Sequence, residues 1–270
     1  MGKIKKALYA LKEIIREPSV LNHIIDENNA WQRRVAEKHR LPKGLPQIQP
    51  TDLFPDFSDT LKSISFLGGV SLATDLCLLK GLCRKFENAS YFEIGTWRGE
   101  SVANVADVAA ECYTLRLSKK QLMSKGFPEI YADAHAFFSK DLPNVTHLED
   151  DSLLFDYAGL NKKFDVVFID GNHHYEYVKA DTEKVFEHLL HENSIVVWHD
   201  YAFNPEKVRF EVMQGILDGT PKEFHAHLYH VANTQCAVFI KGDFRPTVLE
   251  LFQNPKLVFD ITLKSKRVEN

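Results

Sequence analysis

Hydrophobic residues follow two different periods between about residues 61 and 245 of the chain. Short runs of β-branched and aromatic residues alternate there with longer segments whose apolar positions recur at helical spacing. This alternation is typical of a mostly parallel sheet that helices cover on both faces. The expected strands cover residues 91–95, 111–117, 145–149, 164–170, 194–200, 224–231 and 235–240, and the expected helices cover residues 72–86, 101–110, 177–190 and 206–217. We therefore predict a doubly wound α/β fold with a seven-stranded sheet, closed by an antiparallel hairpin of its last two strands.

A basic amphipathic helix is expected at the start of the chain. Its apolar positions recur at helical spacing and basic residues lie around them, the apolar ones being Ile4, Leu8, Leu11, Ile14 and Ile15 and the basic ones Lys3, Lys5, Lys6, Lys12 and Arg16. Three roles are open for this helix: a lid over the domain, an arm that pairs with a second copy in a homo-oligomer, or peripheral contact of residues 1–16 with an anionic membrane surface.

The remaining segments divide the chain into three parts. A second short helix is expected from Ser19 to about Asn28, and a stretch with three prolines and one glycine, residues 41–50, is expected to be a loop. We predict a helical extension over residues 1–60, one sheet domain over residues 61–245 and a tail over residues 246–270.

Composition and charge narrow the class of protein. The net charge is −4, so no basic field favours nucleic acid as a partner. No apolar run reaches the roughly 18 residues of a membrane-spanning helix. Charged residues also interrupt the apolar positions of the N-terminal segment, unlike the core of a secretory signal. The four cysteines form no C-x-x-C pair, which favours reduced thiols. We expect a cytoplasmic protein.

A glycine turn follows the first expected strand. The strand ends in Gly95, and Gly99 precedes a helix that begins near Ser101. In a doubly wound sheet, ligands bind outside the carboxyl ends of the strands at such a turn, and glycine lets the backbone approach them. The G-x-x-x-G spacing differs from that of dinucleotide-binding and P-loop proteins. An ordinary strand-to-helix turn is the alternative interpretation.

Acidic and histidine residues end the fourth and fifth strands. Asp170 closes one strand, and His199 and Asp200 close the next. Parallel neighbours lie about 4.8 Å apart, so these three side chains are expected to converge at one edge and form a divalent-metal site. Oxygen donors alone suit Mg²⁺, whereas a histidine ligand favours Mn²⁺, Fe²⁺ or Zn²⁺.

Two further histidines follow the same edge. His173 and His174 come three and four residues after Asp170, beyond a Gly-Asn turn. A histidine that titrates near neutral pH can take a proton from a hydroxyl group. Both are therefore candidates for a catalytic base, and the alternative for each is a solvated loop residue.

These motifs together resemble those of a known family. The segments that carry the resemblance are FEIGTWRGES at residues 92–101, Asp151-Ser152, FDVVFIDGNHHY at residues 164–175 and IVVWHDY at residues 195–201. They are similar to the class I S-adenosylmethionine-dependent methyltransferases, in the branch called methyltransferase family 24. This branch groups with metal-dependent sugar and macrolide O-methyltransferases and with cephalosporin-hydroxylase-like proteins. The resemblance covers about residues 60–240 and implies a Rossmann-like fold.

The resemblance also implies roles for individual residues. The cofactor S-adenosyl-L-methionine would meet Glu93, Gly95, Thr96, Trp97, Gly99 and Ser101 at the glycine turn, Ser118 after the second strand, Asp151 and Ser152 after the third, and Asp170 after the fourth. In the family, the turn approaches the methionine moiety and the residues after the third strand meet adenine. Ser118 stands where the family usually carries an acidic residue that binds ribose. The metal-dependent sugar enzymes carry an acidic pair where this chain has His199 and Asp200, and a histidine base of the macrolide enzymes matches His173.

The predicted activity is methyl transfer from S-adenosylmethionine to a hydroxyl of a sugar, a glycan or a glycosylated small molecule. A divalent metal would assist it and a histidine would act as base. Two alternatives are kept. One is a non-haem metal oxygenase or hydrolase on the same fold, with Asp170, His173 and His199 as ligands. The other is a non-catalytic binding protein.

Overall fold

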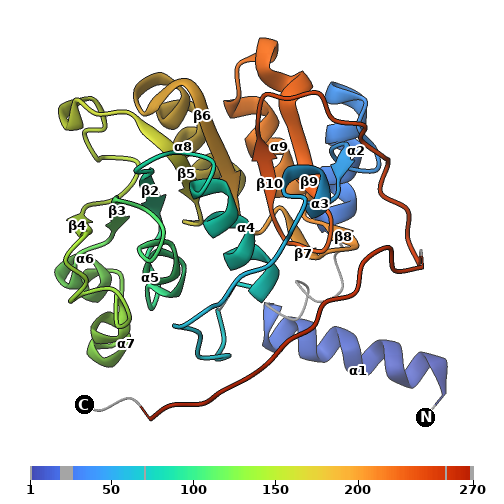
Figure 1. The fold of residues 1–270 in the computed structure, drawn as a ribbon. Helices are drawn as coiled ribbons and strands as arrows, with labels where there is room; N and C mark the ends of the chain where they lie inside the picture. The colour runs from blue at the N-terminus through green and yellow to red at the C-terminus, as the bar shows by residue number, and fades with distance from the viewer. Residues whose placement is uncertain (1, 19–26, 70, 253, 268–270) are drawn as a thin grey trace.

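The computed structural model describes residues 2–18, 27–69, 71–252 and 254–267 of the chain. Its α-helices are α1 (Lys3–Arg16), α2 (Glu27–His39), α3 (Pro50–Leu53), α4 (Ala73–Cys83), α5 (Glu100–Val105), α6 (Lys119–Ser124), α7 (Glu129–Ala134), α8 (Tyr175–His188) and α9 (Phe210–Gly219). Its strands are β1 (Gln47–Ile48), β2 (Ser90–Ile94), β3 (Glu111–Arg116), β4 (Val145–Glu149), β5 (Phe164–Ile169), β6 (Leu190–Trp198), β7 (Ala202–Asn204), β8 (Lys207–Val208), β9 (Leu228–Val231) and β10 (Ala237–Phe239). Figure 1 shows how they are arranged.

The main sheet has eight described strands in the order β1-β9-β10-β6-β5-β2-β3-β4. β10 runs antiparallel to both of its neighbours, and the other pairs in the described sheet are parallel. The predicted mostly parallel, doubly wound sheet with a closing antiparallel hairpin is thus confirmed. The eighth strand was not predicted: β1 comes from the N-terminal segment and pairs with β9.

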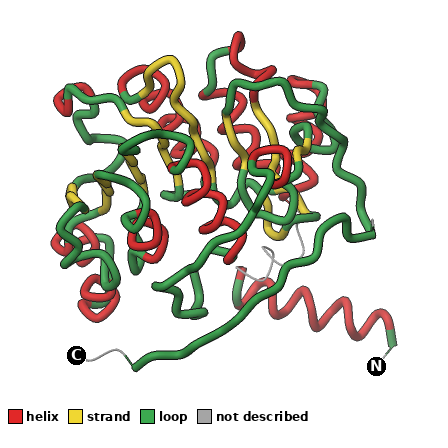
Figure 2. The backbone as a smooth tube through the Cα atoms, viewed as in Figure 1, coloured by secondary structure: helices red, strands yellow, loops and turns green. Residues whose placement is uncertain are grey.

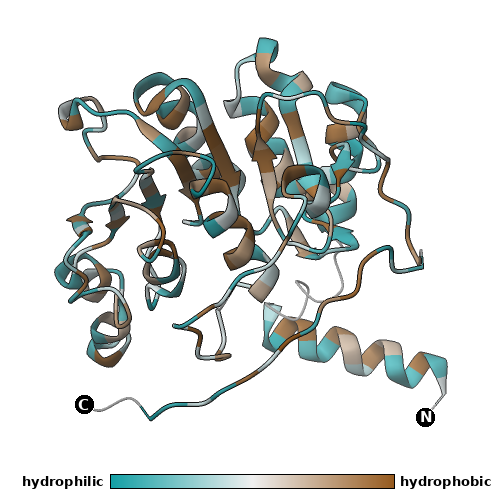
Figure 3. Cartoon of the chain, in the orientation of Figure 1, coloured by the Kyte–Doolittle hydropathy of each residue, from teal (hydrophilic) through white to brown (hydrophobic). Residues whose placement is uncertain are grey.

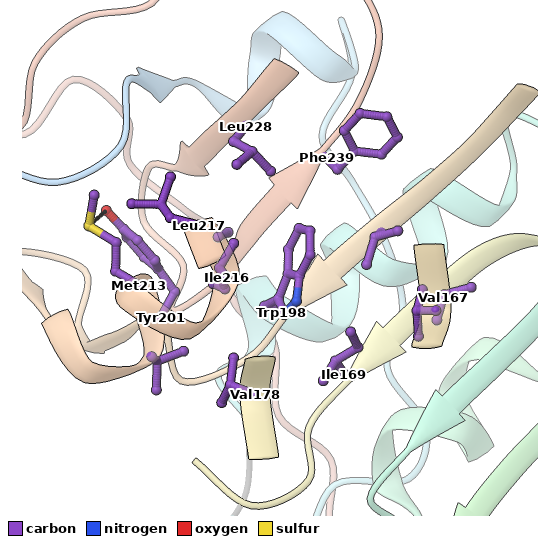
Figure 4. Packing of buried hydrophobic residues seen from close by; sticks show 14 of the residues in the cluster. Val167, Ile169, Val178, Trp198, Tyr201, Met213, Ile216, Leu217, Leu228 and Phe239 are labelled. Carbon is purple, nitrogen blue, oxygen red and sulfur yellow. Dashed lines mark hydrogen bonds between the residues drawn. The ribbon is translucent and has the colours of Figure 1, made fainter. Parts of the chain in front are cut away.

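Alternating side chains of the central strands feed two separate cores. On β5, Val166 and Phe168 face one core, which α4 and α5 cover, while Val167 and Ile169 face the other, which α8 and α9 cover. Helices therefore flank the yellow strands on both sides in Figure 2. Figure 4 shows the second core, where Trp198 of β6 packs among aliphatic side chains of the strands and of α8 and α9. Full burial on both faces explains why these strands read as continuous apolar runs.

The N-terminal segment packs against the sheet domain from residue 27 onward. The Asn28 side chain accepts a hydrogen bond from the Phe210 backbone N–H at 2.8 Å and donates one to the Val208 carbonyl at 3.0 Å. Lys38 at the other end of α2 forms an ion pair with Asp218 of α9, with 2.6 Å between Nζ and Oδ1. α2 thus joins the helical layer formed by α8 and α9. Most of the helix expected from Ser19 lies outside the described residues.

Several expected elements differ from the observed ones. Residues 224–227 were expected in a strand but belong to a 3₁₀ helix, Lys222–His227, that follows Pro221, so β9 starts only at Leu228. The helix expected from residue 206 begins at Phe210, because Lys207–Val208 pairs as β8 with β7. The short helices α6 and α7 were not predicted, because six residues give too few turns for a helical period to be visible.

Burial of β1 leads to a stability prediction. Ile48 is fully buried in the core that α4 and α5 cover, whereas Ile4 of α1 is 77% exposed. We expect Ile48→Ala to lower the free energy of unfolding by about 2–4 kcal/mol, because it leaves a cavity in the core. The matched change Ile4→Ala should alter it by less than about 0.5 kcal/mol. Urea unfolding of both variants measures this, and equal stability losses would contradict the placement of β1 in the sheet.

Candidate active site

The carboxyl ends of β2, β5 and β6 form one edge at the point where the strand order reverses. β2 lies between β3 and β5, and the chain leaves these strands toward opposite sides of the sheet. Backbone hydrogen bonds continue past the strand ends: Gly95 N–H donates to the Leu115 carbonyl at 2.9 Å, and Asp170 N–H donates to the Ile94 carbonyl at 2.8 Å. The loops that carry the predicted site residues are therefore held together where ligands of such folds bind.

The two glycines of the turn are required by close contacts within the protein. Gly95 has φ +100°, and a Cβ added to it would lie 2.0 Å from the Asp170 carbonyl oxygen. Gly99 has φ +80°, and a Cβ there would lie 2.3 Å from Ser139 Oγ. Both positions need glycine for its left-handed backbone and for the space that a side chain would fill. The turn and the loop after β5 thus pack directly on each other.

Glu93 lies below the turn and inside the sheet. It is fully buried, and its carboxylate accepts hydrogen bonds from Tyr91 Oη at 2.8 Å and from Thr114 Oγ1 at 3.2 Å. Burial raises the pKa of Glu93 to about 7, although hydrogen bonds from Ser101 and Tyr91 oppose the shift. Thr96 bonds to the same Thr114 hydroxyl. Glu93, Thr96 and Ser101 therefore belong to one buried polar group that supports the turn.

An aromatic wall flanks the turn on the side of α7. Trp97 stacks on Tyr131 with 4.4 Å between ring centroids and meets His135 edge-on at 4.8 Å. His135 Nδ1–H donates to the Thr96 carbonyl at 2.9 Å, so Nε2 is an acceptor. This Nε2 is buried and has no hydrogen-bond partner in the part of the chain that the structure describes. Tyr131 and His135 were missed from the sequence, because neither follows a strand nor belongs to a motif.

The loops after β3 and β4 are joined by a chain of polar contacts. Ser118 caps α6: its hydroxyl donates to Gln121 Oε1 at 2.8 Å and accepts from the Gln121 backbone N–H at 3.2 Å. The Gln121 amide donates to Asp150 Oδ1 at 3.1 Å. Asp151 Oδ1 in turn accepts from the Leu153 backbone N–H at 3.1 Å. Ser118 and Asp151 thus have structural roles in these loops, and their contacts with ribose and adenine stay predictions.

Ser152 is anchored from α8. Lys184 Nζ donates to its backbone carbonyl at 3.0 Å. Asp181 of the same helix is fully buried, and this burial raises its pKa to about 6. Lys184 of α8 therefore holds the loop expected to meet adenine, whereas both carboxylate oxygens of Asp181 are buried without a hydrogen-bond partner among the described residues.

His199 lies between three carboxylates. Its Nδ1 is 3.1 Å from Asp170 Oδ1 and 3.3 Å from Asp200 Oδ2, and its Nε2 is 3.2 Å from Asp75 Oδ2. Burial disfavours a charged imidazole, but the charge of Asp170 and the hydrogen bonds that the ring donates to all three carboxylates raise the pKa of His199 well above its ordinary value. Asp75, on α4, was missed because near a helix start a carboxylate is expected to cap the helix, which it also does at the Leu72 N–H.

His173 completes a second group of side chains at the same edge. Its Nδ1 is 3.1 Å from Asp200 Oδ2. Asp170, His173 and Asp200 each offer one atom within 4.8 Å of the others, close enough to share a metal ion. Burial would raise the pKa of Asp200, but His199, His173 and Arg209 together lower it to about 2. Asp200 also has φ +53°, a strained conformation for a residue with a side chain.

The structure therefore changes the predicted ligand set in one position. Asp170, His199 and Asp200 do converge, as expected, but both ring nitrogens of His199 already contact carboxylates, and His173 takes its place in the candidate metal group. His174 does not join the group. Its side chain is 79% exposed and its Nδ1 lies 3.2 Å from Glu211 Oε1 on α9. A shallow pocket lies along this edge between Gly171, His173 and His199.

Comparison with known proteins finds one matching family. Residues 92–201 match the methyltransferase-domain family called methyltransferase family 24. No curated protein sequence matches the chain.

Solved structures of methyltransferases are similar to part of this chain at low sequence identity. A Bacillus cereus O-methyltransferase in complex with S-adenosylhomocysteine is 15% identical, with 65% of this chain and 84% of that chain covered and a TM-score of 0.45. The Podospora anserina methyltransferase PaMTH1 is 18% identical, with 64% and 80% covered and a TM-score of 0.43. The amino pentose methyltransferase CalS10 from Micromonospora echinaspora is 18% identical, with a TM-score of 0.35. That match covers 50% of this chain and 51% of that chain, so this chain spans about half the length of that relative.

The contact between Gly95 and the loop after β5 can be tested by a single methyl group. We expect Gly95→Ala to lower the free energy of unfolding by at least about 2 kcal/mol, because the new Cβ meets the Asp170 backbone and φ is positive. Gly126→Ala is the matched control, since Gly126 has φ +90° but nothing within 4 Å of an added Cβ. It should cost only about 1 kcal/mol. Equal losses in chemical denaturation would show that the close contact does not exist.

Proposed function

Because residues 92–201 match a methyltransferase-domain family, we propose that the protein transfers a methyl group from S-adenosylmethionine to a hydroxyl oxygen of a sugar, a glycan or a glycosylated small molecule. One observation carries the proposal. Asp170, His173 and Asp200 meet at the carboxyl edge of the sheet, next to the glycine turn of β2. A proton acceptor and two carboxylates thus lie where this fold holds its ligand.

The residues around the turn fit the cofactor. His135 Nε2 is a buried acceptor without a partner among the described residues, and it suits a hydroxyl donor such as those of ribose. It would supply an acceptor on a side of the turn where Ser118 offers no carboxylate. Trp97 and Tyr131 supply flat apolar surface beside it. The methionine end would meet Gly95 and Thr96, and the loop at Ser152 would meet adenine.

We assign the role of base to His173. When bound, S-adenosylmethionine supplies an activated methyl group on a sulfonium. The protein then has to place the acceptor oxygen and remove its proton. His173 Nδ1–H faces Asp200 Oδ2 at 3.1 Å, which leaves Nε2 as the basic nitrogen. The His173 side chain is 45% exposed, so a substrate hydroxyl can reach it.

A divalent metal and the proton of the substrate hydroxyl would compete for the imidazole ring of His173. If His173 bound an ion through Nδ1, Nε2 would carry the proton and could not accept another. We therefore assign the metal to Asp170 and Asp200, whose oxygens belong to the candidate metal group, and keep His173 as base. Two carboxylates that bind one cation could also orient two neighbouring hydroxyls of a sugar, since such an ion keeps open positions.

Two adjacent histidines provide a matched test of the base. We expect His173→Ala to keep its affinity for S-adenosylhomocysteine, measured by isothermal titration, and to lose methyl transfer about 10²-fold or more. His174→Ala should keep both, because His174 contacts Glu211 outside the cluster. Transfer of a labelled methyl group to a panel of sugars and glycosides measures the rate. Equal activity of the two variants would move the base elsewhere, and no transfer by the wild type to any hydroxylated acceptor would contradict the proposed reaction.

The metal assignment has its own test. We expect manganese to bind the wild type, and Asp170→Asn to weaken that binding by about tenfold or more, because an amide oxygen carries no charge. Asp141→Asn is the control, since Asp141 is exposed and does not belong to the candidate metal group. Titration calorimetry with manganese chloride measures the affinities. A wild type that binds no manganese, or an Asp170→Asn variant with unchanged affinity, would remove the metal from the proposal and leave the histidine base intact.

A further inference from the structure

Helix α1 has no contact that buries any of its residues. None of the 14 residues from Lys3 to Arg16 is buried, and four large aliphatic side chains are largely exposed: Ile4 at 77%, Leu8 at 63%, Leu11 at 55% and Ile15 at 74%. Figure 1 shows α1 apart from the helices that cover the sheet. These four side chains therefore contribute little to the stability of the domain, in contrast to the buried Val35 of α2, and the role of a lid packed on the domain has no support in their contacts.

The exposed aliphatic residues form a single stripe. Ile4, Leu8, Leu11 and Ile15 are separated by four, three and four positions, the spacing that aligns side chains on one face of a helix. Figure 3 shows hydrophobic and hydrophilic residues in turn along α1, as expected for a helix with two unlike faces. We call these four residues the apolar stripe. A stripe of this size without a cover marks an interaction surface.

Charge selects the partner of the apolar stripe. α1 contains five basic residues and one acidic residue, Glu13, although the whole chain has a net charge of −4. At 100° per residue, Lys5 and Lys12 lie along one border of the stripe and Lys3 lies along the other. Two copies of α1 packed stripe to stripe would bring these lysines together, and α1 has no acidic residues at those positions to pair with them. A surface that is both apolar and negatively charged satisfies the stripe and its borders at once.

We propose that α1 binds the surface of a membrane that contains anionic lipids. The helix would lie in the plane of the interface, with the apolar stripe among the acyl chains near the head groups. The lysines on its borders would extend toward lipid phosphates. α1 has 14 residues, and in the described parts of the chain no helix is long and apolar enough to cross a membrane. The helix thus acts as a reversible surface anchor that holds the sheet domain near the membrane.

Vesicle flotation with the full chain tests this inference. The wild type should float with vesicles of phosphatidylcholine and phosphatidylserine, and bind vesicles of phosphatidylcholine alone at least about tenfold more weakly, because the lysines lose their partners. High salt should release it from the charged vesicles. The double change Leu8→Glu and Leu11→Glu should lower binding by about tenfold or more. Ile130→Glu is the control, since Ile130 lies on α7 and is 80% exposed, and it should bind like the wild type.

Thermal unfolding of the same variants checks that they remain folded. Both should unfold at the same temperature as the wild type, because no residue of α1 is buried and Ile130 is 80% exposed. A wild type that does not float with either kind of vesicle, or a double variant that floats as well as the wild type, overturns the proposal. Light scattering tests the alternative that a second copy of α1 covers the apolar stripe. If the wild type bound no vesicles and formed a dimer that the double change dissociated, the apolar stripe would bind a second copy of the chain. That result would also overturn the proposal. The outcome does not depend on the proposed methyl transfer.

Discussion

His199 holds together three parts of the molecule that lie far apart in the sequence. Its ring contacts Asp75 of helix α4, Asp170 after β5 and Asp200 after β6. Three carboxylates at one place would repel each other strongly in a buried environment, and an imidazole with a raised pKa supplies the compensating positive charge. Without this ring, Asp75, which is fully buried, and Asp170 would lose their ion-pair partner among the described residues. The position of the candidate catalytic residues therefore depends on it.

Two histidines at the carboxyl edge have different roles: His199 positions the neighbouring carboxylates, and His173 is the candidate base. His199 is 9% exposed and has carboxylates on both ring nitrogens, whereas His173 is 45% exposed and contacts only Asp200 among the described charged groups. The buried histidine can thus fix Asp200, and Asp200 can in turn fix the tautomer of the exposed histidine. The strained backbone of Asp200 is consistent with a residue whose place is set by these contacts rather than by local preference.

The sequence was informative where burial determines the residue type. β5 and β6 are buried on both faces, so their apolar runs and the polar residues that end them, Asp170 and His199, could be recognised directly. β1 could not be predicted, since its two residues lie between prolines and become a strand only by pairing with β9. The same limit applies to contacts made across the fold. The local pattern at Asp75 indicates only a helix cap and His135 belongs to no motif, so their place in the site follows from tertiary packing.

The central claim is that the edge formed by β2, β5 and β6 binds S-adenosylmethionine beside the cluster of Asp170, His173 and Asp200. A crystal structure of the full chain grown with S-adenosylhomocysteine and manganese tests it most directly. We expect the homocysteine end over the Gly95 turn, a ribose hydroxyl at His135 Nε2, and anomalous density from manganese at Asp170 and Asp200. Ligand density elsewhere in the molecule, or an empty edge in crystals soaked at high ligand concentration, would contradict the account.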